Sequence, residues 1–378
     1  MGQSVNSIAK EEEGTLCSLG KGVHAPPVFE ESKALCGAGL LFMLPSLLAQ
    51  GLLKAKEVFH LPSSHYYGLE SVVLTLAFMT LARIKNPEQL KQCKPGEIGR
   101  LIDLDRIPEV RCLREKIKFI SEQQRSVHFN NLLINQWYHE DNREDTGFLY
   151  VDGHVRIYYG YKANLPSKFV SRQKLCLSAT SEFWVNDAKG MPVMMVMGEL
   201  SEKLQTVIEH QIIPRLMEAK LISADIGHQQ EPQCTLVFDR EAYEPAFFQR
   251  LWEKYRVAII TYRKNVRDQW NKERFESIDV QVLNHIINMD LCEQDTELGG
   301  CWMREIRQVA GRMFARWSQE NFFRYLIQDY DFDKMISFGV ETIDMEKTVV
   351  NPQYRKLTYS RGFAHVSLKI FLFHFMVN

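Results

Sequence analysis

The chain has 378 residues, of which 45% are hydrophobic and 25% are charged, and its formal net charge is −1. This is the composition of an ordinary globular protein, long enough for two or three domains. A nearly neutral chain neither requires nor excludes a nucleic-acid partner, because acids elsewhere can offset a basic groove. None of the eight cysteines lies in a C-x-x-C pair, which argues against a zinc site or a disulfide framework and indicates reduced thiols in a cytosolic setting.

The sequence predicts neither a secretory signal nor a membrane span. Residues 1–31 are polar, and we expect them to form a disordered leader. The most apolar stretch, residues 40–53, is too short to cross a bilayer and contains Pro45 and Gln50. We therefore expect a soluble protein with no membrane partner.

Apolar residues recur at helical spacing from about residue 32 to about residue 124, which predicts an all-helical N-terminal domain. Helices are expected at 34–59 (one helix, or a pair split near Pro45), 68–84, 86–93, 96–104 and 108–123. Short helices joined by the turn at 103–108 would suit a helix-turn-helix-like, DNA-binding module. A purely structural helical cap explains the same pattern equally well.

From residue 147 the spacing becomes that of strands. "GFLYVDG" (147–153) and "HVRIYYGY" (154–161) predict a hairpin that turns at Asp152-Gly153, and a second hairpin is expected from 181–187 and 191–200. The remaining segments are a helix at 202–219, a strand at 234–241, a helix at 245–255, a strand at 256–265, a polar insertion at 266–303, a long helix at 304–330 and a tail at 331–378. This order predicts an α/β fold, a mixed sheet flanked by helices in the order of the ribonuclease-H-like fold.

Three carboxylates, Asp152, Asp239 and Glu320, fall on the first strand, after the fourth strand and on the late helix of that fold. Mg²⁺ prefers carboxylate oxygens, and two such ions about 3.5–4 Å apart can assist both the attacking and the leaving oxygen in phosphodiester cleavage. Each acid also has an ordinary explanation, as a hairpin turn, a helix cap or a solvated helix residue respectively. Their order on these elements favours the metal site.

Four blocks of the sequence resemble bacterial insertion-sequence transposases of the DDE class. They are 68–91, 148–175, 236–252 and 316–326, within a region of similarity from about 35 to about 353. The resemblance implies a ribonuclease-H-like catalytic domain at 147–330, with Asp152, Asp239 and Glu320 as the catalytic and metal-binding triad and two Mg²⁺ or Mn²⁺ ions as cofactors. It also implies cleavage at transposon ends, attack of the freed 3′-hydroxyl on target DNA, a homodimer in the DNA complex, and a place in the bacterial cytoplasm at the nucleoid.

One branch of that family carries a Tyr, Arg, Glu, Lys signature at fixed spacing. Arg316 and Glu320 match it, whereas Met313 and Ile327 stand at the Tyr and Lys positions. Arg316 and Glu320 lie one helical turn apart and so share a face. The resemblance therefore makes Arg316 a candidate phosphate contact.

Further DNA contacts are expected from two basic stretches, 250–274 and 167–174, in which aromatic residues that could stack on bases are interleaved. A solvated charged face would look the same. The candidate residues are Arg263, Lys264, Arg267, Lys168, Arg172 and Lys174. His154, two residues after Asp152, could shuttle a proton or touch DNA, but a surface histidine is the simpler interpretation.

Two other functions are open from the sequence. A nuclease of the same fold would cut DNA without joining it. A catalytically inactive DNA-binding remnant is suggested by the apolar ending "SRGFAHVSLKIFLFHFMVN" (360–378), where the family leads us to expect a further helical tail and a truncated or frame-shifted end is one interpretation.

Overall fold

The structure is a computed structural model, and all of its described elements belong to one compact unit, Met1–Ile336. Most of the expected leader and the tail beyond residue 336 lie outside the described residues. The structure describes residues 16, 19, 21, 37–62, 65–102, 104, 106–138, 147–160, 162–170, 174–227, 231–264, 271–293 and 306–336.

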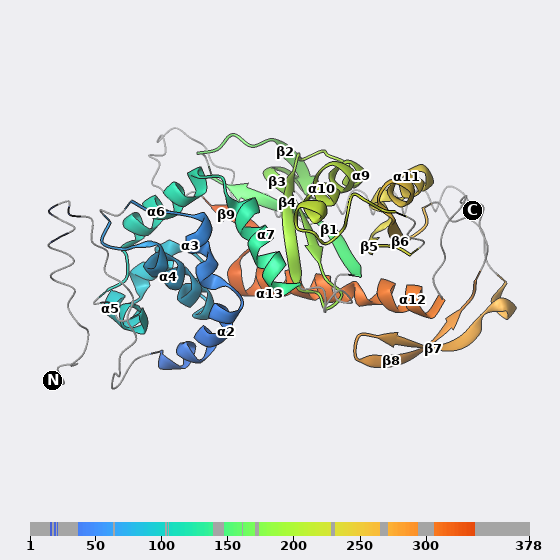
Figure 1. Cartoon of the computed structure of the whole chain (residues 1–378), viewed down its shortest axis with the longest axis horizontal. Helices are drawn as coiled ribbons and strands as arrows, with labels where there is room; N and C mark the ends of the chain where they lie inside the picture. Colours follow the sequence, from blue (N-terminus) through green and yellow to red (C-terminus); the bar gives the residue numbers. More distant parts are fainter. Residues whose placement is uncertain are drawn as a thin grey trace, which may run out of the picture. The chain divides into compact units, whose positions relative to one another are not determined.

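Every described element before residue 138 is helical (Figure 1). These elements are η1 (Ala38–Met43), α2 (Leu44–Ala49), η2 (Leu52–Lys54), α3 (Ala55–Val58), α4 (Leu69–Leu81), η3 (Pro87–Gln92), α5 (Pro95–Gly99), η4 (Arg100–Ile102), α6 (Val110–Glu122) and α7 (Ser126–Trp137). The first predicted helix is interrupted at Gly51 rather than near Pro45. Pro45 lies in the first turn of α2, where a missing N–H is harmless, whereas Gly51 has a φ of 90° that favours glycine.

Among the described helices, no single one is both long and apolar enough to span a membrane. The pair Ala38–Ala49 and Leu52–Val58 meets the length and composition together but is bent by 60°.

Helix α7 was not predicted from the sequence, and it packs against the sheet. Ile134 is fully buried in the same core cluster as the strands, and Asn130 Nδ2 donates a hydrogen bond to the carbonyl of Val193 at 3.0 Å. The strands that follow are β1 (Phe148–Tyr159), β2 (Ser167–Val170), β3 (Leu175–Asn186), β4 (Pro192–Gly198), β5 (Cys234–Phe238), β6 (Val257–Thr261), β7 (Glu276–Val282), β8 (His285–Leu291) and β9 (Lys334–Ile336).

Seven of these strands form one mixed sheet, in which β4, β3, β1, β5 and β6 lie side by side in that order. The pairs β3–β4, β1–β3 and β2–β3 are antiparallel, while β1–β5, β5–β6 and β1–β9 are parallel. The predicted hairpin of β3 and β4 is therefore confirmed. The polar insertion forms a separate antiparallel hairpin, β7–β8.

The hairpin predicted at Asp152-Gly153 is wrong, because β1 runs unbroken through both residues. Residues 150–157 pair one for one with residues 179–186 of β3. Gly153 lies opposite Phe183, whose ring would come within 3.2 Å of a Cβ at that position. Glycine is used here for a close approach of side chain to backbone and not for a turn.

The two faces of the sheet differ because successive strand residues point to opposite sides. Val151 and Val185 pair on one face and belong to the core cluster formed with the helices of the crossover. Asp152 and Trp184 pair on the other face, where the Trp184 ring packs against Phe322. The described helical elements after the first strands are α9 (Leu204–Val207), η6 (Ile208–Ile212, a π-helix), α10 (Ile213–Glu218), η7 (Arg240–Ala242), α11 (Pro245–Tyr255), η8 (Lys272–Arg274), α12 (Ile306–Ala315) and α13 (Trp317–Tyr330).

The long helix predicted at 304–330 is two helices, α12 and α13, that meet at Arg316 (orange in Figure 1). Helix α12 packs against β7 at Gly311, where a Cβ would lie 2.4 Å from the carbonyl oxygen of Gln281. Helix α13 ends at Asp331, which has a φ of 49°, and the chain then returns to pair with β1 as β9. The insertion thus packs against α12, and the segment after α13 pairs with the main sheet.

Candidate functional site

The parallel register of β1 and β5 places Asp152 level with Asp239. Phe148, Leu149 and Tyr150 pair with Thr235, Leu236 and Val237, an offset of 87 residues in each case (235 − 148). Asp152 and Asp239 are separated by the same 87 residues (239 − 152). Asp152 lies within β1 and Asp239 just after β5, each two residues beyond the last of these pairs. Adjacent strands lie about 4.8 Å apart, so continuing the register sets the two acids at the same height.

Glu320 reaches the site from α13. It lies in the first turn of that helix, and its Oε1 is 3.1 Å from Nη2 of Arg316. The Arg316 side chain is only 15% exposed, whereas that of Glu320 is 41% exposed. The arginine is therefore held inside the site and the glutamate stands at its open side.

The pKa of Asp152 is affected by both other acids. Burial raises its pKa from 3.8 to about 6, the Arg316 guanidinium and the Gly153 amide oppose that rise, and the charges of Glu320 and Asp239 add to it. The Gly153 N–H donates to Asp152 Oδ1 at 3.0 Å. The structure thus brings the three predicted residues into one electrostatic neighbourhood with an excess of negative charge.

An excess of carboxylate charge around a partly buried acid is the donor chemistry that suits a hard divalent cation. Within the described part of the chain, however, no three His, Cys, Asp or Glu side chains stand close enough together to hold a metal ion. Glu320 is turned to Arg316, and Asp239 accepts a hydrogen bond from the N–H of Arg240 at 2.7 Å as the cap of η7. The residue types fit the ion, and the carboxylates would have to turn inward to bind it.

His154 is not a surface residue, and that interpretation of the sequence is wrong. Its ring is 8% exposed and stacks on Phe323 of α13 at a centroid distance of 5.4 Å. Phe332, just after α13, packs on the same ring. His154 therefore helps to seat α13 on the sheet instead of facing DNA.

A glutamine that the sequence analysis did not identify lies beside the triad. Gln319 is fully buried, and its Nε2 donates to the carbonyl of Tyr150, to the carbonyl of Trp184 and to Oδ1 of Asn186. Nothing in its local sequence marks it, because a polar residue on an amphipathic helix is expected to face water. The signature positions Met313 and Ile327 are both partly buried apolar residues.

Some of the predicted DNA-binding residues lie beside the acids. Arg263 and Lys264 are exposed directly after β6, the parallel neighbour of β5. Lys264 Nζ donates to the carbonyl of Glu241 at 2.8 Å, which holds it against the segment that follows Asp239. On the other side of the sheet, Lys168 is partly buried on β2 and Lys174 is exposed before β3, while Arg172 and Arg267 lie outside the described residues.

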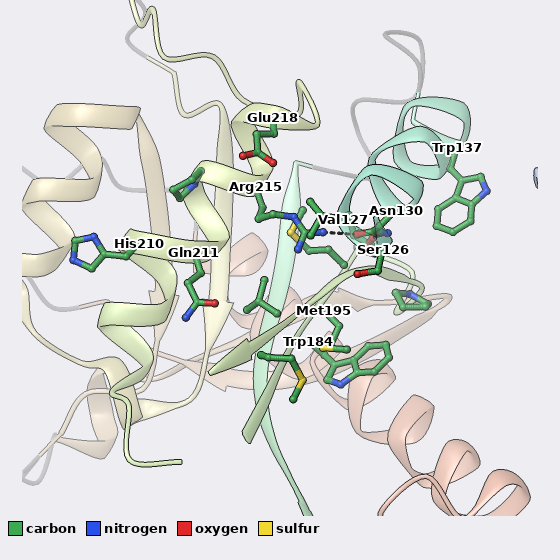
Figure 2. Close-up of a pocket in the computed structure, with 16 residues that line it drawn as sticks. Ser126, Val127, Asn130, Trp137, Trp184, Met195, His210, Gln211, Arg215 and Glu218 are labelled. Carbon is green, nitrogen blue, oxygen red and sulfur yellow. Dashed lines mark hydrogen bonds between the residues drawn. The ribbon is translucent and has the colours of Figure 1, made fainter. Parts of the chain in front are cut away.

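A cavity of about 700 Å³ lies elsewhere, along β4 between α7 and α10. Figure 2 shows Asn130 and Arg215 pointing toward one another across it, joined by a 2.8 Å hydrogen bond, with Met195 beside Trp184. Its remaining lining is mostly apolar, and none of Asp152, Asp239 and Glu320 lines it. The acids instead lie on β1, just after β5 and on α13.

The sequence matches one protein family, described as "Transposase protein", over residues 6–311 and 301–362. Searches of the curated proteins and of the solved structures found no match.

Proposed function

Because the chain belongs to the transposase protein family, we propose that it is a DDE-type enzyme that cuts DNA at transposon ends and transfers the freed strands into target DNA. DNA is the partner that a transposase implies. The family match covers most of the chain, including the helices before the sheet and the segment that carries Glu320. We also propose that two copies act together, since joining two transposon ends requires both to be held at once, and that the enzyme works in the bacterial cytoplasm at the nucleoid.

The order of the strands supports a ribonuclease-H-like catalytic domain. Three antiparallel strands, β1, β3 and β4, are followed by two strands that extend the sheet in parallel from β1, with helices at each crossover. In that fold, the first strand, the fourth strand and a late helix carry the catalytic acids, and we take Asp152 on β1, Asp239 after β5 and Glu320 on α13 as their counterparts. The register that sets Asp152 level with Asp239 is the observation that carries the proposal.

The three acids, Asp152, Asp239 and Glu320, would hold the Mg²⁺ or Mn²⁺ ions. When bound, such ions supply charge neutralisation and orientation of the attacking and leaving oxygens of a phosphodiester. Binding and orientation of the DNA would depend on other side chains of this protein. Arg316, inside the site, is placed to bind a phosphate oxygen, which would release Glu320 from its ion pair.

The exposed cations next to the acids would orient the DNA. Arg263 and Lys264 leave β6 at the same end of the sheet as Asp239 leaves β5, so a backbone bound by them passes the triad. Lys168 and Lys174, with Arg172 and Arg267, are proposed as further phosphate contacts on the basis of sequence alone.

Nicking of a supercoiled plasmid that carries the native transposon ends tests the proposal. In the presence of Mg²⁺ the wild-type protein should nick and then join these ends, and Asp152→Asn and Asp239→Asn should each abolish both steps while DNA binding persists. Asp225→Asn is the matched control, because Asp225 is exposed and also accepts a backbone N–H, at 3.0 Å. Full activity in both triad variants would refute the assignment.

A second candidate is an inactive DNA-binding remnant of a transposase. It is favoured by the departures at Met313 and Ile327 and by carboxylates that do not converge on one point. The same assay separates the alternatives by their products: joined ends from a transposase, cut ends alone from a nuclease, and intact plasmid with bound protein from a remnant.

A further inference from the structure

The amide of Gln319 is buried at the point where α13 meets the sheet. The side chain is 0% exposed, and its Nε2 lies 3.2 Å from the carbonyl oxygen of Tyr150 and 3.2 Å from that of Trp184. Tyr150 stands two residues before Asp152 on β1, and Trp184 is the residue of β3 that pairs with Asp152. One amide of α13 is therefore bonded both to β1, the strand that carries Asp152, and to the neighbouring strand β3.

A second buried amide completes this contact. Asn186 is also 0% exposed; its Oδ1 accepts from Gln319 Nε2 at 2.8 Å, and its own Nδ2 donates to the carbonyl of Gly190 at 2.9 Å. Gly190 has a φ of 84°, and a Cβ there would lie 2.8 Å from Cβ of Ser318. The β3–β4 turn thus packs closely against Ser318, and β3, the strand before it, binds Gln319 through Asn186.

These contacts form a closed ring that starts and ends on α13. It runs from Gln319 to Asn186, on to Gly190, and back to Ser318, the residue before Gln319. Two adjacent residues of the helix are held at once, so neither rotation about the helix axis nor sliding along it is free. The next residue in the chain is Glu320.

Stability alone does not account for this arrangement. The Oε1 atom of Gln319 is buried without a hydrogen-bond partner among the described residues. A buried carbonyl oxygen without a partner is unfavourable, and an apolar side chain of the same length would avoid that penalty. The glutamine instead fixes the orientation of α13, because its Nε2 finds acceptors only where the two backbone carbonyls and Asn186 lie together.

We propose that Gln319 is a positioning residue, which together with Asn186 fixes the first turn of α13 so that Glu320 and Arg316 stand opposite Asp152. The consequence for catalysis rests on the transposase function proposed above, whereas the placement of the helix does not. Gln319 does not itself meet the DNA, because it is enclosed by the sheet.

The test compares Gln319→Met with Gln328→Met. Both replace a glutamine of α13 by an apolar side chain of similar length, but Gln328 is exposed. A third variant, Ile102→Ala, removes a fully buried side chain from the N-terminal helices and serves as a control for loss of stability. Each full-length variant is assayed for plasmid nicking, for binding of transposon-end DNA and for thermal unfolding, at a temperature where all remain folded.

We expect Gln319→Met to lower the turnover of nicking by about 10²-fold with end binding changed by less than about two-fold, since small displacements of catalytic groups have effects of that size. Gln328→Met and Ile102→Ala should keep the wild-type turnover. The proposal is overturned if Gln319→Met nicks DNA normally, or if Ile102→Ala loses as much turnover at a similar loss of stability.

Hydrogen exchange separates this proposal from the function on which it rests. In Gln319→Met, exchange should rise in peptides from the first half of α13 and stay unchanged in its last turn, whether or not the protein cleaves DNA. If the wild type cuts no DNA but this pattern appears, the proposed function fails and the positioning stands. If exchange in α13 is unchanged, the positioning is wrong even for an active enzyme.

Discussion

Replacing Asp152 by asparagine should stabilise the protein while abolishing its activity. In the folded protein the pKa of Asp152 is raised from 3.8 to about 6, mainly by burial. This difference corresponds to about 3 kcal/mol, because each pKa unit is worth about 1.4 kcal/mol. Asparagine retains the oxygen that accepts the Gly153 N–H but carries no charge, so it resembles the protonated acid. At pH 7.5 and without metal ions, we expect the free energy of unfolding to increase by up to about 3 kcal/mol.

The sign of the pH dependence follows from the same shift. An acid with a higher pKa in the folded state binds its proton more tightly there, so the contribution is most favourable below pH 4 and is lost as the pH rises through about 6. The stabilisation by Asp152→Asn should therefore be full at pH 7.5 and much smaller at pH 4. Urea unfolding of both proteins in the presence of a chelator measures this, with tryptophan fluorescence as the signal.

Asp225→Asn provides the matched control for this measurement. Asp225 also accepts a backbone N–H but is exposed, and its substitution should leave the unfolding free energy nearly unchanged at both pH values. Two results would contradict the prediction: destabilisation by Asp152→Asn at pH 7.5, or equal stabilisation at pH 4. Either would show that burial and the neighbouring carboxylates do not raise the pKa of Asp152.

Two further substitutions test the packing around the site. Arg156→Met should destabilise the protein by about 3–5 kcal/mol, because it leaves Glu182, which is 1% exposed and bonded to Arg156 at 2.7 Å, as an unpaired buried charge; an unchanged urea midpoint would contradict this. Gly311→Ala would normally strengthen a helix by about 1 kcal/mol, but here the new Cβ would lie 2.4 Å from the Gln281 carbonyl, so we expect a loss of about 1–3 kcal/mol and faster proteolysis of the β7–β8 hairpin. A more stable Gly311→Ala protein would show that α12 can move away from β7 freely.

The elements that carry the three proposed acids could be predicted from the sequence, because the signal lies in whole strands and helices. The strand before Asp239 is five fully buried residues, and Pro245 marks the start of α11, so the position of Asp239 at a strand end could be predicted. The meeting of Asp152 with Asp239 then depends only on a parallel pairing of β1 with β5. The order of strands and helices implied that pairing before the register was known.

Local patterns misled where tertiary contacts override them. Asp-Gly is a strong turn signal, yet at Asp152-Gly153 the ring of Phe183 takes the space that a side chain would need, and the strand continues. His154 looked like a surface residue, yet Phe323 and Phe332 cover it. The deciding partner is 30 residues away from Gly153 (183 − 153) and 169 and 178 residues away from His154 (323 − 154 and 332 − 154), so local spacing could not identify it.

Gln319 could not be identified from the sequence, because its role depends on tertiary contacts. Residues that bind an ion or DNA are revealed by their type, whereas a residue that orients a helix is revealed only by what lies opposite it. Of the three acids that we propose as the triad, Glu320 is the one that β-strand register does not place, since it comes from α13. Its position depends on side-chain contacts: its own ion pair with Arg316, and the hydrogen bonds of the preceding residue, Gln319, to Tyr150, Trp184 and Asn186. In the positioning that we propose, a neutral amide and not the acids themselves therefore sets how accurately the third acid is placed.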